Sequence, residues 1–232
     1  MTILGIESSC DETAVSICRN GKILSNIVSS QEVHNNYGGV VPEVASREHD
    51  RLLNILVLES IKKANVSLND IEGIGVTKGP GLAGTLLTGV SFAKGFSQSL
   101  NIPIIGINHL EAHIYANFLA YPELKYPLVC LLVSGGHTQI WYIKNIFDYE
   151  LLGDTRDDAA GEAFDKGARI LGLGYPGGPV IEKIADRGNS NAIKFPRALM
   201  DKDNLEFSFS GLKTSLLYFV KKEHSYNIED VV

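Results

Sequence analysis

The chain has 232 residues, of which 44% are hydrophobic and 21% charged, and its net charge at pH 7 is -6. This is the composition of a folded protein with a sizeable core, which excludes a disordered chain. It also excludes an overall attraction to nucleic acid, so an RNA partner would need a local basic patch or another subunit. No apolar run reaches the roughly 18 residues of a membrane span, and the first residues lack a signal-peptide pattern. Three scattered cysteines without a C-x-x-C pair indicate a reducing compartment, so we expect a cytoplasmic protein.

Strand and helix patterns alternate along the first half of the chain. The predicted elements, in order, are strands at 2–7, 13–18 and 21–30, a helix at 43–65, a strand at 71–77, a glycine-rich loop at 78–84, a helix at 85–100 and a strand at 102–108. The second and third strands are joined at Asn20-Gly21, which is typical of a tight hairpin turn. The alternation predicts an α/β architecture.

Residues 128–143 repeat the pattern of residues 2–18, with "SGGHT" where the first copy has "SSCDET". Each copy is an apolar strand, a small polar turn and a second apolar strand. If this is a duplication and not a coincidence, the chain has two lobes with a cleft between them, at 1–110 and 111–232. The last residues, "NIEDVV", look like a helix start with Asn227 as N-cap, and we interpret a chain that stops there as a fragment.

Residues 108–113 read "NHLEAH", which places His109 and His113 four apart on one face of a predicted helix. Both rings can therefore present a nitrogen to one cation. In the metallopeptidase motif H-E-x-x-H the glutamate follows the first histidine directly, whereas Glu111 lies roughly 200° around the helix from His109. The peptidase interpretation is excluded. A two-histidine half-site that needs further ligands remains, and a solvated helix face is the alternative.

Two glycine-rich segments could contact an anion. Gly135 and Gly136 of "SGGHT" can bring backbone amides to a ligand, or they can form a hairpin turn that needs positive φ. The segment "KGPGLAGT" could direct a helix N-terminus at an anion. Neither it nor "SGLKT" is a P-loop, because both lack the G-K-[ST] ending.

Two carboxylates also stand out. Asp165 lies within a helix predicted inside residues 154–178, where aspartate is unfavourable, so a ligand or tertiary role competes with an ion pair to Arg169. Asp11 lies in the first polar turn, where it could orient a reacting group or stabilise the turn as an Asx motif.

These segments together resemble one family closely. The matching stretches, in order from Met1 to Thr214, are "GIESSCDETA", "YGGVVPEVASREH", "GPGLAGTLLTG", "NHLEAH", "LLVSGGHTQ", "DDAAGEAFDK", "YPGGP" and "FSFSGLKT". They resemble the bacterial tRNA adenosine threonylcarbamoyltransferases, formerly labelled O-sialoglycoprotein endopeptidases. The resemblance implies a two-lobed actin-like, sugar-kinase-like ATPase fold of duplicated ribonuclease-H-like lobes, with the second lobe incomplete. It also implies transfer of a threonylcarbamoyl group from threonylcarbamoyl-adenylate to the exocyclic amine of adenosine 37, in tRNAs that read codons beginning with A.

The resemblance further implies roles for single residues. His109 and His113 become ligands of one divalent metal ion, with iron expected and zinc the alternative, and Asp11 becomes a catalytic residue that polarises the reacting centre. The residues implied to bind the adenylate are Leu132, Val133, Ser134, Gly135, Gly136, Asp165 and Gly178, and Glu182 falls where some relatives have an aspartate on the nucleoside.

The expected partners are tRNA, a paralogous non-catalytic subunit (TsaB-like) and a P-loop ATPase (TsaE-like). The family continues beyond the matched segments with an aspartate metal ligand and an asparagine on the nucleoside, so we expect weak or no activity from these 232 residues alone. One alternative is a non-catalytic paralogue that scaffolds the complex, which the intact "HLEAH" disfavours. A sugar- or nucleotide-phosphorylating enzyme of the same fold is another, and the absence of a DxGxT-type first turn disfavours it.

Overall fold

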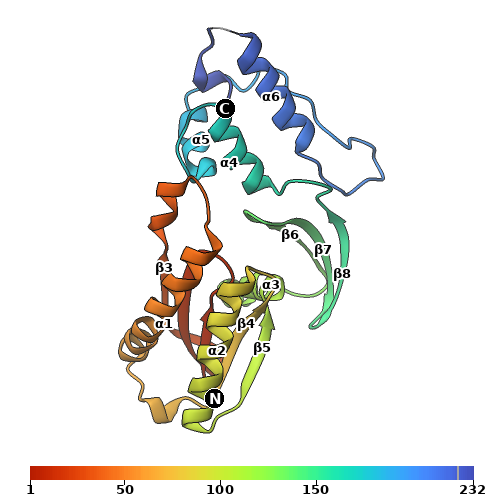
Figure 1. Ribbon diagram of the computed structural model, residues 1–232. Helices are drawn as coiled ribbons and strands as arrows, with labels where there is room; N and C mark the ends of the chain where they lie inside the picture. Colours follow the sequence, from red (N-terminus) through yellow and green to blue (C-terminus); the bar gives the residue numbers. More distant parts are fainter. Residues whose placement is uncertain (224) are drawn as a thin grey trace. The chain divides into compact units, whose positions relative to one another are not determined.

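The computed structural model describes residues 1–223 and 225–232, which form two compact units, Met1–Leu124 and Lys125–Val232 (Figure 1). The predicted lobe boundary at residue 110 lies earlier than this division, within helix α3 (His109–Ala120). The helix belongs to the first unit because it packs on two strands of that unit's sheet and its first histidine contacts Glu7.

A five-stranded mixed sheet forms the first unit, with the strand order β3-β2-β1-β4-β5. The strands are β1 (Thr2–Glu7), β2 (Glu12–Arg19), β3 (Lys22–Ser30), β4 (Gly73–Gly79) and β5 (Ile104–Asn108). Strand β1 pairs antiparallel with β2 and parallel with β4, and β4 pairs parallel with β5. Asn20 and Gly21 have φ values of 52° and 77°, so the predicted hairpin turn is confirmed.

Two long helices, α1 (Pro42–Ala64) and α2 (Ala83–Leu100), cover one face of this sheet (Figure 1). The strand residues that alternate towards them are almost fully buried, and they form the core together with Leu53 and Val57 of α1. Burying one such side chain contributes about 1.5–3 kcal/mol. Helix α3 packs on β4 and β5. Together with Gly5 and Ser16 it lines a pocket on the face of the sheet opposite α1 and α2. Short 3-10 helices at Glu32–Tyr37 and Leu68–Asp70 complete the unit.

The second unit repeats the opening of the first. Its strands β6 (Leu128–Val133), β7 (Thr138–Asn145) and β8 (Asp148–Asp154) form an antiparallel sheet in the order β6-β7-β8, like β1-β2-β3. The predicted duplication of an α/β lobe is therefore confirmed. Within the described residues the second unit has no counterpart of β4 and β5, which agrees with the expected incomplete second lobe.

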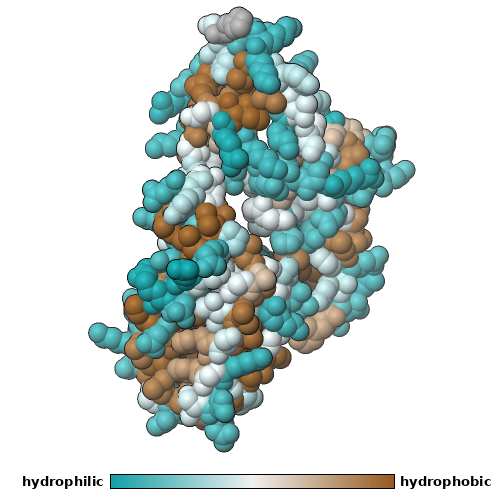
Figure 2. All heavy atoms as spheres, viewed as in Figure 1, coloured by the Kyte–Doolittle hydropathy of each residue, from teal (hydrophilic) through white to brown (hydrophobic). Residues whose placement is uncertain are grey.

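Helices α4 (Ala160–Ile170), α5 (Gly177–Ala185) and α6 (Ser210–Lys222) of the second unit surround an apolar cavity of about 340 Å³. Figure 2 shows hydrophobic atoms gathered at the surface over this part of the unit. A 3-10 helix at Ile228–Asp230 lies at the same cavity, and the Asn227 side chain accepts a hydrogen bond from the Glu229 amide. The predicted N-cap is confirmed. Among the described residues, none of the helices combines the length and apolar character needed to traverse a membrane.

We predict that Leu53→Ala lowers the free energy of unfolding by about 2–5 kcal/mol, because Leu53 is 0% exposed and its loss leaves a cavity in the core of the first unit. The measurement is urea unfolding of the 232-residue chain followed by circular dichroism. Leu58→Ala is the matched control, since Leu58 lies on the same helix but is 54% exposed. Equal effects of the two substitutions would contradict the assigned core.

Candidate functional site

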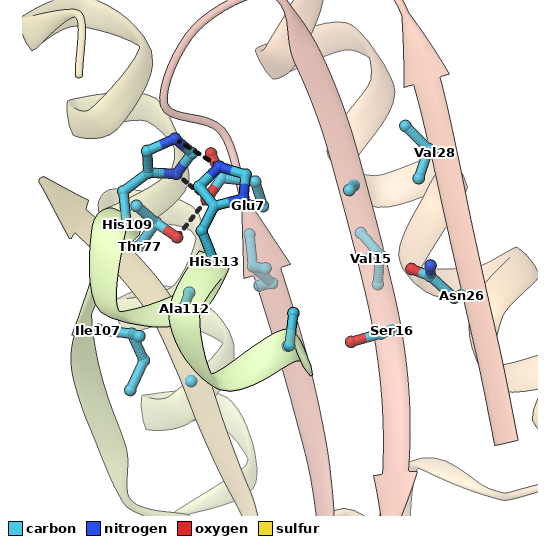
Figure 3. Close-up of a pocket in the computed structure, with 15 residues that line it drawn as sticks. Glu7, Val15, Ser16, Asn26, Val28, Thr77, Ile107, His109, Ala112 and His113 are labelled. Carbon is cyan, nitrogen blue, oxygen red and sulfur yellow. Dashed lines mark hydrogen bonds and ion pairs between the residues drawn. The ribbon is translucent and has the colours of Figure 1, made fainter. Parts of the chain in front are cut away.

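The two histidines of α3 lie at the carboxyl end of β5 (Figure 3). The helix begins there because Asn108 is its N-cap, with Oδ1 accepting from the amides of Leu110 (2.8 Å) and Glu111 (3.2 Å). His109 and His113 are one turn apart, so their rings meet edge to face with centroids 4.5 Å apart. Their Nε2 atoms are 3.2 Å apart. The predicted helical placement of the pair on one face is confirmed.

The geometry of the pair fits two ligands of one metal ion. Two nitrogens that bind a tetrahedral zinc at about 2.05 Å lie about 3.3 Å apart, close to the 3.2 Å between the Nε2 atoms. Two neutral rings that share one hydrogen explain the same distance without a metal. Within the described part of the chain, no group of three or more His, Cys, Asp or Glu side chains is arranged to hold a metal ion. The metal half-site therefore stays a prediction.

A carboxylate at the end of β1 supports the first histidine. Oε2 of Glu7 lies 3.2 Å from Nδ1 of His109 and accepts a hydrogen bond from the Thr77 hydroxyl at 2.5 Å. Oε1 of Glu7 accepts from the amide of Ser9 at 2.5 Å. Burial alone would raise the pKa of Glu7, but the hydrogen bonds from His109, Ser9 and Thr77 outweigh it and lower the pKa to about 2. Glu7 therefore carries a negative charge at neutral pH.

The first polar turn is held by a buried histidine of α1. Nε2 of His49 lies 2.9 Å from the carbonyl oxygen of Cys10, and its Nδ1 lies 2.8 Å from the hydroxyl of Thr13. Because a carbonyl only accepts, Nε2 carries the hydrogen and Nδ1 accepts from Thr13. The carbonyl of Asp11 accepts from the amide of Gln31 at 3.0 Å. Backbone contacts on both sides thus fix the position of the half-buried Asp11.

The thiol next to Asp11 is not a reactive one. Burial and, after it, the negative charge of Asp11 raise the pKa of Cys10 to about 12. A thiol with this pKa stays protonated at neutral pH and is a poor nucleophile. Cys10 is therefore not a candidate nucleophile, and the catalytic role of Asp11 stays a prediction.

The glycine-rich loop at 78–84 packs against the same turn. The amide of Leu82 donates to the carbonyl of Ser9 at 2.8 Å, one residue before α2 begins. A Cβ on Gly81 would lie 2.5 Å from that carbonyl oxygen, which explains why the position needs glycine. In the described structure this loop positions the turn. Binding of an anion at the N-terminus of α2 stays a prediction.

In the second unit, the turn after β6 packs on the start of α4. The amide of Gly161 donates to the carbonyl of Ser134 at 3.2 Å, and a Cβ on Gly161 would lie 2.8 Å from the Cα of Gly135. Neither Gly135 nor Gly136 has positive φ. The prediction that a hairpin turn needs glycine here because of positive φ is therefore wrong. A Cβ added at either residue would meet nothing within 4 Å, so the backbone of this turn is open to a ligand.

Asp165 and Gly178, both predicted to contact the nucleoside, are brought close together. Oδ1 of Asp165 accepts from the amide of Gly177 at 2.7 Å, so a residue in the middle of α4 supports the first residue of α5. A Cβ on Gly177 would lie 2.5 Å from the carbonyl of Phe164, which requires glycine at this helix contact. The tertiary role of Asp165 is confirmed. Glu182 is exposed on α5, one turn after Gly178.

The two residues before the glycine turn differ in exposure. Leu132 is 6% exposed, so its side chain belongs to the interior of the second unit and only its backbone is available to a ligand. Val133 is 53% exposed. Their role in adenylate binding stays a prediction.

Comparison with known proteins decides the family. The model of the TsaD family, described as tRNA N6-adenosine threonylcarbamoyltransferase, matches residues 22–232. The protein of that name from Thermosipho melanesiensis is 59% identical over 232 residues, which are 100% of this chain and 71% of the relative. The one from Clostridium novyi is 56% identical over 230 residues, which are 98% of this chain and 67% of the relative.

The chain belongs to the tRNA N6-adenosine threonylcarbamoyltransferase family. The predicted enzyme class, a transferase that modifies tRNA, is confirmed by the names of these relatives. Component A of (R)-2-hydroxyglutaryl-CoA dehydratase from Acidaminococcus fermentans shares the fold, with a TM-score of 0.55 at 13% identity. The match covers 100% of this chain and 72% of that one, in agreement with the predicted actin-like architecture.

Two adjacent carboxylates connect two motifs of the chain. Sequence reasoning missed both of them. Asp157 of "DDAAGEAFDK" accepts from the amide of Phe209 (2.7 Å) at the start of α6, the helix that carries "SGLKT". Burial opposes ionisation, but the hydrogen bonds outweigh it and lower the pKa of Asp157 to about 2. Asp158 lies between the ammonium groups of Lys166 (2.6 Å) and Lys213 (2.8 Å). The two motifs thus stabilise each other.

Glu7 and His49 were also missed, although both lie in stretches that resemble the family. The available signal was weak: a charged residue in an apolar strand, and a histidine on the apolar face of a helix. Asp11, His109 and His113 belong to the first unit, and the predicted adenylate-binding residues belong to the second. Each half of the candidate site is therefore described within its own unit.

We predict that acid weakens the fold through His49. Burial disfavours its charged form and lowers its pKa, an effect that the Cys10 carbonyl and the charges of Glu7 and Asp11 only partly offset, while His34 adds to it. The unfolded value is about 6.5. The stability that neutral His49 contributes is thus fully present above about pH 6.5 and is lost as the pH falls from there towards the folded value.

The measurement is the free energy of unfolding of the wild type and His49→Gln between pH 7.5 and pH 5, values chosen to bracket the unfolded pKa of about 6.5. The wild type should lose stability with acid more steeply than the variant, which lacks the contribution of His49. Parallel slopes would show that His49 does not titrate with unfolding.

Proposed function

We propose that the protein of which these residues are part transfers a threonylcarbamoyl group from threonylcarbamoyl-adenylate to the exocyclic amine of adenosine 37 in tRNAs that read codons beginning with A. Family membership supports a transferase acting on tRNA. The observation that carries the proposal is the histidine pair, whose Nε2 atoms are 3.2 Å apart beside the first turn. A non-catalytic scaffolding paralogue would have no need of this pair.

The proposed reaction is an acyl transfer. The amine nitrogen forms a bond to the carbamoyl carbon, the bond from that carbon to the phosphate oxygen breaks, and AMP leaves as the amine loses one proton. Asp11 polarises the reacting centre, because its turn is held by His49 and Gln31 while its carboxylate is half-buried. A positioned charge of this kind acts without having to reorganise during the reaction.

His109 and His113 are the proposed ligands of one divalent ion, iron by expectation with zinc as the alternative. When bound, such an ion supplies Lewis acidity to a carbonyl oxygen. The chain's own contribution is to present two Nε2 atoms at the right spacing from one helix face. Further ligands come from water or from protein outside the described residues.

The second unit is proposed to hold the adenylate. The open backbone at Ser134, Gly135 and Gly136 suits the phosphate, with Leu132 and Val133 leading into it. Asp165 and Gly178 contact the nucleoside, and their closeness across the contact of α4 and α5 supports a common task.

The proposed partners are tRNA, a paralogous non-catalytic subunit (TsaB-like) and a P-loop ATPase (TsaE-like), and the proposed location is the cytoplasm. A net charge of -6 favours sharing the tRNA-binding surface with another subunit. The 232 residues match 71% of one relative and 67% of another. We propose that this segment by itself is weakly active or inactive.

We predict that His109→Ala and His113→Ala each abolish stoichiometric metal binding by the chain, because one imidazole cannot hold the ion at the required geometry. The measurement is elemental analysis after loading with iron(II) or zinc under anaerobic conditions. Glu111→Gln on the same helix is the control and should keep its metal. Unchanged metal content in both alanine variants would remove these residues from the ligand set.

Mass analysis of anticodon-loop fragments tests the reaction itself, after unmodified tRNA is incubated with threonylcarbamoyl-adenylate and the proposed partner subunits. We predict product with a full-length relative and little or none with the 232-residue chain. In the full-length protein, the substitution equivalent to Asp11→Asn should reduce the rate at least about 100-fold, as loss of a positioned electrostatic group does. Product at equal rates from all three proteins would contradict the assignment of Asp11 and the predicted inactivity of the segment.

A further inference from the structure

Glu7 contacts three segments that come together only in the folded chain. Its two oxygens accept from the Ser9 amide in the first turn and from the Thr77 hydroxyl on β4, and one of them faces His109 on α3. Ser9 and Thr77 are each 4% exposed, and the side chains of Glu7 and His109 are 30% and 22% exposed, so the contacts are partly buried. Figure 3 shows the Glu7 carboxylate next to the His109 ring, with dashed lines joining Glu7, His109 and His113. The carboxylate is therefore firmly oriented.

The two ring nitrogens of His109 face different groups. Nδ1 faces the Glu7 carboxylate at 3.2 Å, and Nε2 faces His113 at 3.2 Å. A neutral imidazole carries its one hydrogen on either nitrogen, and only the other nitrogen can bind a metal ion. Which tautomer forms is set by the hydrogen bond made at Nδ1.

We propose that Glu7 is a positioning residue that keeps the hydrogen of His109 on Nδ1, so that the lone pair of Nε2 points at the ion shared with His113. This inference rests on the proposed metal site. It assigns to Glu7 the part that a carboxylate plays in a carboxylate–histidine–metal arrangement. The carboxylate does not touch the ion, and it acts through His109.

One other group competes for Nδ1 of His109. The hydroxyl of Ser9 lies 3.3 Å away and would donate its hydrogen if Nδ1 were unprotonated. In that arrangement Nε2 would carry the ring hydrogen and could not bind a metal. An ionised carboxylate can only accept a hydrogen bond, whereas the Ser9 hydroxyl can donate or accept, so the contact with Glu7 favours the hydrogen on Nδ1.

The direct test is the tautomer of His109 in the metal-free 232-residue chain. Long-range ¹H–¹⁵N correlation spectra distinguish a protonated from an unprotonated ring nitrogen, and comparison with His109→Ala assigns the signals. We expect a protonated Nδ1 in the wild type and a mixture of both tautomers in Glu7→Gln, because the amide offers one acceptor oxygen in place of two. Ser9→Ala should leave Nδ1 protonated.

Zinc affinity, measured by competition with a chelator, is the second readout. Glu7→Gln should weaken binding about 10- to 100-fold, as loss of a carboxylate behind a metal-binding histidine does. Glu72→Gln is the matched control, because Glu72 also accepts from a backbone amide, that of Thr2 at 2.6 Å, but makes its contact at the other end of β1. It should change neither the tautomer nor the affinity.

A protonated Nε2 in the wild type, or an unchanged tautomer in Glu7→Gln, would overturn the role of Glu7. If Glu7→Gln does not fold, Thr77→Val takes its place, with a smaller change in the same direction, since it removes one of the hydrogen bonds that orient the carboxylate. A wild-type chain that shows the expected tautomer but binds no zinc would refute metal binding by these two histidines within the segment and leave the Glu7–His109 hydrogen bond established.

Discussion

The parallel pairing of β1, β4 and β5 is the constraint on which the first half of the site depends. Parallel strands end at the same edge of a sheet, and ligands of open α/β folds bind outside that edge. Glu7 ends β1, Thr77 lies near the end of β4, and Asn108 ends β5 and is the N-cap of α3. Residues separated by 70 and 102 positions in the chain therefore meet within hydrogen-bonding distance.

The first polar turn follows from the same edge. It begins directly after Glu7, and its backbone is held by His49 of α1, by Gln31 and by the loop before α2. His49, Gln31 and the loop before α2 bind backbone carbonyl groups of the turn, and the catalytic role of the Asp11 side chain stays a prediction. The core beneath the sheet, to which α1 contributes Leu53 and Val57, therefore also helps to fix the position of this turn through His49.

The second unit uses close backbone contacts for the same purpose. Gly161 lets α4 approach the turn after β6, and Gly177 lets α5 approach the middle of α4. Asp157 and Asp158 then connect α4 to α6 through backbone amides and two lysines. Acidic residues thus make contacts that hold the fold together, which the net charge of -6 does not reveal.

The sequence by itself determined the local elements, because they depend on neighbours in the chain. The alternation of apolar residues placed the strands, Asn20-Gly21 placed a hairpin turn, and a spacing of four placed His109 and His113 on one helix face. Family resemblance added the enzyme class.

Only the tertiary structure decided that Glu7 faces His109, that His49 holds the first turn, and that Asp165 binds the amide of Gly177. It also divides the chain into two compact units at Leu124 and gives neither Gly135 nor Gly136 a positive φ. These contacts join segments far apart in the chain or depend on the distance between two backbones. A local pattern of residues contains no information on which distant segments meet or on how closely two backbones approach.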